Sequence, residues 1–114
     1  VHTGESTATL DLSEHMTAHA DVQFDEQFIS LHAPILVGEG SGISGQCLWR
    51  GERGEVLLEY PAEVFAPEVE TIPSEDHFGT PIAVYRLLLR GRSRVTQQRV
   101  DLRFTCRTLP RRSA

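Results

Sequence analysis

The sequence contains no lysine: all eleven of its positive charges are arginine, against sixteen acidic side chains, which gives a net charge of −5. It also has no apolar run close to the roughly 20 residues that cross a bilayer. The longest run, over 82–89, is interrupted by Arg86. The first residues show neither the basic start nor the apolar block of a signal peptide. The sequence therefore predicts no membrane span and no leader within these 114 residues.

Motifs of enzymes and of cofactor sites are equally scarce. The glycine-rich stretch GEGSGISG, over 38–45, has no Walker lysine, no dinucleotide fingerprint and no G-x-S-x-G context for its serines. The acidic run over 68–76 lacks the spacing of an EF-hand loop. The sequence thus leans against an enzyme, and it predicts no cofactor.

His15 and His19, with Asp21 nearby, are the best-spaced candidates for metal ligands. On a helix, residues four apart share a face and both could reach one ion. On a strand they stand about 13 Å apart, at roughly 3.3 Å per residue. The apolar–polar alternation over 15–24 favours a strand. No metal site is therefore predicted.

Alternation of this kind runs through most of the chain. In RVDLRFTCR, over 99–107, polar side chains fall on one face, and the other face carries Val100, Leu102, Phe104 and Cys106. Alternation over 6–12 and 15–24 predicts further strands, and Pro34 indicates an edge or a turn. Segments 46–60 and 81–107 are each predicted to form a hairpin, the second with its turn over 91–96. The proline-rich acidic segment over 61–81 is predicted to be a long connection.

Short strands with turn signals between them, and no convincing helix, indicate an all-β fold. We expect a single domain over 1–114, folded as an antiparallel, immunoglobulin-like β-sandwich of about seven strands. The comparison with antibody domains concerns the architecture, because their cysteine, tryptophan and tyrosine spacing is absent. Trp49 follows Cys47 by only two residues, and Phe104 stands where those domains place a tyrosine.

Charge is distributed unevenly along the chain. Residues 1–80 carry fifteen acidic side chains against Arg50 and Arg53, whereas residues 81–114 carry nine arginines against Asp101 alone. One interpretation is a basic, nucleic-acid-binding face formed by Arg99, Arg103 and Arg107. The other is neutralisation between neighbouring acidic and basic strands. We favour the second, because the arginines alternate with core residues and are not clustered with exposed aromatic side chains.

The two cysteines, Cys47 and Cys106, are not arranged as a C-x-x-C pair, so neither a zinc ribbon nor a thioredoxin-type dithiol is predicted. Both lie in apolar, strand-like contexts, and Cys106 is expected to point into the core. A disulfide between them is the preferred expectation, and it would contribute roughly 4 kcal/mol through chain entropy. Buried free thiols are the alternative. A third hypothesis is a reactive Cys106 whose thiolate is stabilised by the flanking Arg103 and Arg107.

One family resemblance covers the C-terminal half. The order VLLEYPAEVF, a proline-rich acidic loop, PIAVYRLLL and VDLRFTCRTLP resembles the N-terminal domain of the thiol:disulfide interchange protein DsbD and its relatives. The resemblance implies an immunoglobulin-like sandwich outside the cytoplasm, periplasmic or secreted. It matches Cys106 to the first redox cysteine of that family and Pro110 to its following proline. Arg107-Thr108-Leu109 stands where the second cysteine would be.

For function, the sequence favours a non-enzymatic module that binds a protein partner or serves as an accessory domain of an extracytoplasmic protein. Sandwiches present edge strands and loops on a rigid frame, and both are common recognition surfaces. The candidate surface consists of Tyr60, Phe65, Ile72 and Phe78, although the same side chains would equally serve to close one end of the core. The alternatives are a thiol-redox domain that uses Cys106, and a structural assembly subunit.

Overall fold

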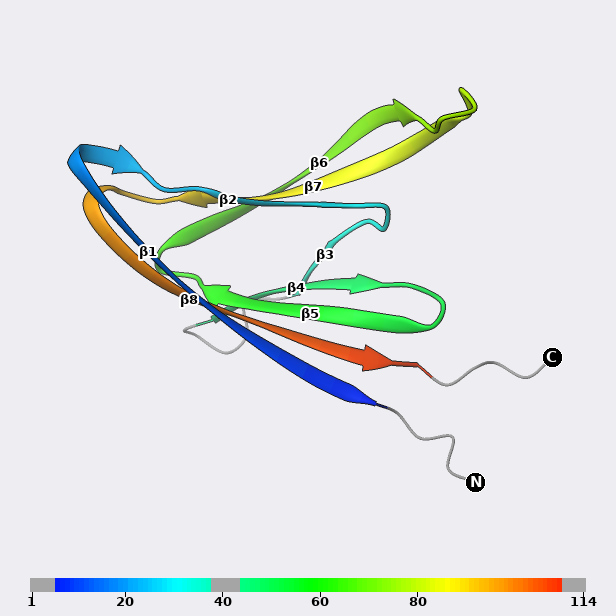
Figure 1. Ribbon diagram of the computed structural model, residues 1–114, viewed down its shortest axis with the longest axis horizontal. Helices are drawn as coiled ribbons and strands as arrows, with labels where there is room; N and C mark the ends of the chain where they lie inside the picture. The colour runs from blue at the N-terminus through cyan, green and yellow to red at the C-terminus, as the bar shows by residue number, and fades with distance from the viewer. Residues whose placement is uncertain (1–5, 38–43, 110–114) are drawn as a thin grey trace.

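The computed structural model describes residues 6–37 and 44–109, and these contain strands but no helix (Figure 1). Within these two ranges, no helix is long and apolar enough to cross a membrane. The strands are β1 (Thr7–Gln23), β2 (Glu26–Ser30), β3 (Ile35–Val37), β4 (Ser44–Arg50), β5 (Gly54–Pro61), β6 (Phe65–Glu75), β7 (Pro81–Gly91) and β8 (Arg94–Thr108).

The strands form two antiparallel sheets. The five-stranded sheet has the order β1-β8-β5-β4-β3, and the three-stranded sheet has the order β2-β7-β6. The prediction of an all-β antiparallel sandwich is therefore confirmed, with eight strands in place of about seven. Of the predicted glycine-rich loop, residues 38–43 lie outside the described residues, while Ser44 and Gly45 belong to β4.

The strand that the sequence did not predict is β6, which occupies most of the segment over 61–81 that was predicted to be a connection. That prediction was wrong because its prolines were taken to exclude pairing. Pro67 and Pro73 lie opposite Leu89 and Ala83 of β7, but β6 is an edge strand whose only neighbour among the described strands is β7. A proline is tolerated on an edge strand when its missing N–H would face solvent.

Of the two predicted hairpins, the structure confirms one and contradicts the other. The first, β4–β5, is confirmed, and its turn is closed by a hydrogen bond of 2.9 Å from Gly51 N to Gly54 O. The second is wrong, because β7 pairs with β2 and β6, whereas β8 pairs with β1 and β5. The chain leaves one sheet at Gly91 and enters the other at Arg94.

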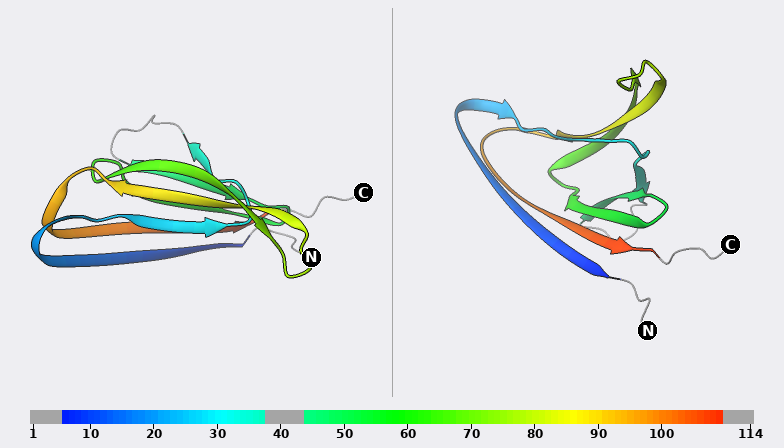
Figure 2. Two further views of the ribbon diagram at one scale, coloured as in Figure 1. Left: turned by 90° about the horizontal axis from the view of Figure 1, so that it is seen from above. Right: turned by 45° about the vertical axis from the view of Figure 1, so that its right-hand side comes forward.

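The chain crosses between the sheets at a shared corner, where β1 leads into β2 and β7 leads into β8 (Figures 1 and 2). Asp25 fastens this corner by accepting hydrogen bonds of 2.8 Å from Gly91 N and from Gln23 Nε2. Gly91 lies so close to Phe24 that a Cβ at position 91 would stand 2.4 Å from the Phe24 carbonyl oxygen. The corner therefore requires glycine.

The core lies where the two sheets overlap, and its buried side chains come from both of them. These are Cys47, Leu58, Tyr60, Phe65, Leu87, Leu89, Val100 and Leu102. Phe28 joins the sheets by packing its ring edge-to-face against Trp49 and Phe104. Away from the corner the β6–β7 hairpin extends clear of the five-stranded sheet (Figure 2).

Candidate interaction groove

Cys47 and Cys106 are both free thiols, so the predicted disulfide is absent. Register explains why. Cys47 lies opposite Leu58, and Leu58 lies opposite Phe104, two residues from Cys106. Two strand spacings and a two-residue offset place the cysteine Cα atoms about 12 Å apart, beyond the roughly 7 Å limit of a disulfide.

The two thiols also differ in environment. Cys47 is fully buried, and burial raises the pKa of its thiol to about 11, against a weaker opposing effect of a backbone hydrogen bond with Ile35. Cys106 is exposed, which corrects the expectation that it points into the core. It shares a sheet face with buried Leu102, but it lies near the end of β8, beyond the region that the three-stranded sheet covers.

The four side chains proposed as a binding surface do not form one. Tyr60 and Phe65 belong to the buried core, so they close the sandwich from inside. Ile72 is half-buried on β6, and Phe78 is 81% exposed in the turn between β6 and β7. The ring of Tyr60 packs directly over Gly45, and burial raises the pKa of its phenol.

Arg99, Arg103 and Arg107 share one face of β8, and acidic strands flank two of them. Arg103 pairs with Asp11 of β1, with Nε 2.7 Å from Oδ1, and Arg107 pairs with Glu55 of β5. Two more ion pairs join β7 to β6, between Arg86 and Glu70 and between Arg90 and Glu68. Much of the charge that is uneven along the sequence is thus balanced across strand pairs.

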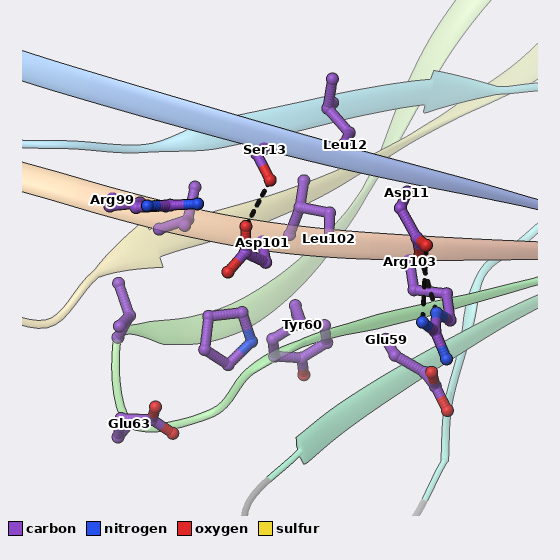
Figure 3. A pocket seen from close by; sticks show the side chains of 13 residues that line it. Asp11, Leu12, Ser13, Glu59, Tyr60, Glu63, Arg99, Asp101, Leu102 and Arg103 are labelled. Atoms are coloured by element: carbon purple, nitrogen blue, oxygen red, sulfur yellow. Dashed lines mark hydrogen bonds and ion pairs between the residues drawn. The ribbon is translucent and has the colours of Figure 1, made fainter.

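An open groove of about 600 Å³ lies on the five-stranded sheet (Figure 3). Strands β1 and β8 form one side, and the end of β5 with the following turn forms the other. Val100 and Leu102 contribute to its lining. Its charged residues are Asp11, Glu59, Glu63, Asp101, Arg99 and Arg103.

The groove exists because the ladder between β5 and β8 stops early. Its last pair is Glu59 with Arg103, and the next hydrogen-bonded pair, two residues further on, would bring Pro61 opposite Asp101. Proline has no N–H to donate, and the Pro61 carbonyl accepts a hydrogen bond of 3.1 Å from Val64 N instead. Strand β5 therefore leaves β8 at this point, and a notch opens in the sheet.

The notch leaves part of the β8 backbone without a strand partner on this side. Thr108 N bonds to Ser6 next to β1, and Leu109 N bonds to Arg53 next to β5. Because hydrogen-bonding direction alternates along an antiparallel strand, the odd-numbered residues of β8 direct N–H and C=O toward β5. At Asp101 and Arg99 the β5 ladder has already ended, so these backbone groups face the groove.

The electrostatics of the groove are dominated by carboxylates. Asp11 binds Arg103, and together with the nearby Glu59 it raises the pKa of that guanidinium. Asp101 accepts a hydrogen bond from Ser13 Oγ. Among the described residues, Glu63 and Arg99 form no ion pair, and Glu59 receives only a long contact of 3.5 Å from Gln46 Nε2. Four carboxylates against two guanidinium groups leave the groove negative.

A second acidic feature lies between the sheets. Glu14 of β1 shares the face of buried Val100, and Glu26 of β2 shares the face of buried Leu89, so the two side chains meet across the sandwich. Burial, and then the neighbouring Glu14 carboxyl through a hydrogen bond and its charge, raises the pKa of Glu26 from 4.5 to about 7.

This pair makes stability depend on pH. A carboxyl with a raised pKa in the folded state holds its proton more tightly than the same carboxyl in the unfolded chain. The stabilisation of the fold by this proton is fully present below pH 4.5, and it is lost as pH rises through about 7. At pH 8 we expect Glu26→Gln to be more stable than the parent protein by roughly 1–2 kcal/mol, allowing for solvent screening. At pH 4.5 the variant and the parent protein should have the same free energy of unfolding.

Urea denaturation at both pH values measures this difference. Glu75→Gln, at an exposed position of β6, is the matched control and should show no such change between the two pH values. An equal gain for Glu26→Gln at both pH values would mean that the carboxyl charge is not its cause.

Sequence reasoning missed the groove, although the Tyr60-Pro61 dipeptide carries its signal. A proline ending a central strand predicts that the next rung of the ladder cannot form. Comparisons of the chain with protein-family models, with curated proteins and with solved structures yield no match.

Proposed function

We propose that the protein is a non-enzymatic β-sandwich module that binds a partner protein, and that the groove beside Pro61 receives an extended segment of that partner. The observation that carries the proposal is the early end of the β5–β8 ladder, which leaves the backbone of Asp101 and Arg99 facing a groove. Strand addition satisfies such groups through main-chain hydrogen bonds, and adjacent pockets supply side-chain specificity.

The charge of the groove favours a partner segment with a basic side chain. Glu59 and Glu63 lie on the β5 side of the groove, and neither is engaged in a salt bridge of the described residues. An arginine or lysine of the partner would meet these carboxylates while its backbone lies along β8. Charge complementarity of this kind contributes mainly to specificity and to the rate of association.

We extend the proposal to an accessory domain of an extracytoplasmic protein, as the DsbD-like order of strands in the C-terminal half implies. The extracytoplasmic placement rests on that resemblance. Partner binding through the groove does not depend on it.

A synthetic peptide tests the groove directly. The probe is a capped heptapeptide of alternating threonine and valine with one central arginine, titrated into the labelled protein and followed by amide NMR shifts. We expect the largest shifts at Asp101 and Arg99. Replacing the central arginine by glutamate should weaken binding clearly. Equal binding of the two peptides, or shifts confined to other sheet edges, would overturn the proposal.

Protein variants sharpen the same titration. Glu63→Gln removes one free carboxylate of the groove and should weaken binding of the arginine peptide about two- to five-fold, as expected for one exposed charge pair. Glu75→Gln, outside the groove, should leave the affinity unchanged. If Glu75→Gln weakens binding as much as Glu63→Gln does, the attraction is due to net charge alone.

A thiol-redox domain is the second candidate function, and the exposed free thiol of Cys106 favours it. It lies beside a shallow hollow that Ala8 and Val56 help to line. Thiol titration of the native protein decides this candidate: Cys106 should react with a disulfide reagent much faster than free cysteine does, and a rate no faster than that of free cysteine would rule the candidate out.

A further inference from the structure

β1 is an edge strand whose backbone is open along one side. It is 17 residues long, and within residues 6–37 and 44–109 it pairs only with β8. The hydrogen bond from Thr108 N to Ser6 O shows that even-numbered residues of β1 bond to β8. By antiparallel alternation, Thr7, Thr9, Asp11 and Ser13 direct N–H and C=O away from the sheet.

The two halves of β1 differ in how this edge is protected. Natural edge strands avoid pairing with other chains by inward-pointing charges and by bulges. The second half has both, namely Glu14 on the inner face and a break in register between Thr17 and Val22. The first half, over 7–13, has neither. Its one charge, Asp11, is neutralised by Arg103.

The unprotected half also exposes apolar surface. Leu10 is 61% exposed and Leu12 is 37% exposed, although both lie on the inner face of the sheet. The three-stranded sheet does not cover them. An added strand on the β1 edge would cover both side chains and satisfy the open backbone groups together.

We propose that this edge pairs with the same edge of a second copy of the chain, antiparallel and centred on Leu10. The dimer would join two five-stranded sheets into one continuous sheet across a two-fold axis. Asp11, Leu12 and Ser13 also line the groove beside Pro61, but the dimer would use the edge of β1 that points away from β8. The inference therefore goes beyond the proposed function and does not depend on it.

Register selects Leu10 as the centre. Only residues whose N–H and C=O point away from β8 can bond to the other copy, and these are the odd-numbered residues. Odd positions must therefore pair with odd positions. Centring on Leu10 pairs Thr9 with Asp11 and Thr7 with Ser13 of the other copy, and no like charges meet. Centring on Asp11 would oppose two carboxylates, which is unfavourable, and centring on Thr9 would leave Ser13 unpaired.

The same register determines the closest side chains. Leu10 meets its own counterpart in a non-hydrogen-bonded pair, where Cα atoms are about 4.5 Å apart, within the range of a disulfide. Leu12 meets Ala8 of the other copy and lies about 13 Å along the strand from the second Leu12. A cysteine at position 10 should therefore link two copies, and a cysteine at position 12 should not.

Oxidative cross-linking in a Cys106→Ser background tests this arrangement. Leu10→Cys should give a disulfide-linked dimer on a non-reducing gel, and Leu12→Cys, the matched control, should remain monomeric. Mixing Leu12→Cys with Ala8→Cys should restore the linked dimer. Cross-linking of Leu12→Cys alone at the rate of Leu10→Cys, or none for Leu10→Cys, would rule out the register.

A blocking variant distinguishes a specific dimer from random collisions. Thr9→Pro removes an N–H that points away from β8, so the β1–β8 ladder is retained while the open edge is lost. It should abolish cross-linking through Leu10→Cys. Leu10→Lys, an inward charge at an exposed position, should lower the dimer fraction of the reduced protein in sedimentation. Dimers that survive both changes would contradict the proposal.

Discussion

Gly91→Ala is expected to lower the free energy of unfolding by about 3 kcal/mol, as severe overpacking does. The added methyl group would stand 2.4 Å from the Phe24 carbonyl oxygen, and both residues belong to the corner where the chain passes between the sheets. Backbone on both sides prevents the contact from relaxing by a rotamer change. Relief requires the corner to open, which would also weaken the hydrogen bond from Gly91 N to Asp25.

Urea denaturation monitored by circular dichroism measures this loss. Gly51→Ala is the matched control, because its added methyl would meet nothing closer than His32 Nε2 at 3.4 Å. That variant should stay within about 0.5 kcal/mol of the parent protein. Similar losses for the two variants would mean that the loss does not come from the contact at the corner, since alanine stabilises through its effect on the unfolded chain.

Phe65→Ala is expected to cost about 3–5 kcal/mol, the usual range for removing a buried aromatic ring. Phe65 is fully buried at the start of β6, and its ring lies 6.2 Å from that of Phe24. Truncation would leave a cavity beside the same corner that Gly91 occupies. A loss of this size is a large part of the stability of an ordinary domain.

Phe78→Ala removes the same atoms from the turn between β6 and β7, where the ring is 81% exposed. It should change stability by no more than about 0.5 kcal/mol. The pair of variants thus separates a core role from a surface role for two residues that the sequence grouped together. A loss above 2 kcal/mol for Phe78→Ala would contradict the placement of that ring in solvent.

Alternation along the strands predicted well which face of the sheet each side chain occupies, but it did not predict whether that side chain is buried. Val100 and Leu102 are buried as RVDLRFTCR indicates, yet Cys106 on the same face is exposed. A period of two reports which side of a sheet a residue occupies. Whether that side is buried depends on how far the second sheet extends over it, and no local sequence pattern predicts this extent.

The partners of each strand were also beyond local prediction. Segments 81–91 and 94–108 have the sequence of a hairpin, but a tight corner at Gly91 sends them into different sheets. The groove depends in the same way on a long-range fact. Pro61 is visible in the sequence, whereas its position opposite Asp101 follows from the pairing of β5 with β8.

The pairing of the first strand with the last has a consequence for how the chain folds. Ser6 and Thr108 are 102 positions apart, and in the part of the chain that the structure describes β1 has no other strand neighbour. During synthesis β1 emerges before β8 and stays unpaired until β8 has left the ribosome, so the five-stranded sheet is completed only after residues 7–108 are all available. Such high contact order gives folding times on the order of milliseconds to seconds. Throughout that interval Leu10 and Leu12 are open to chaperones and to aggregation.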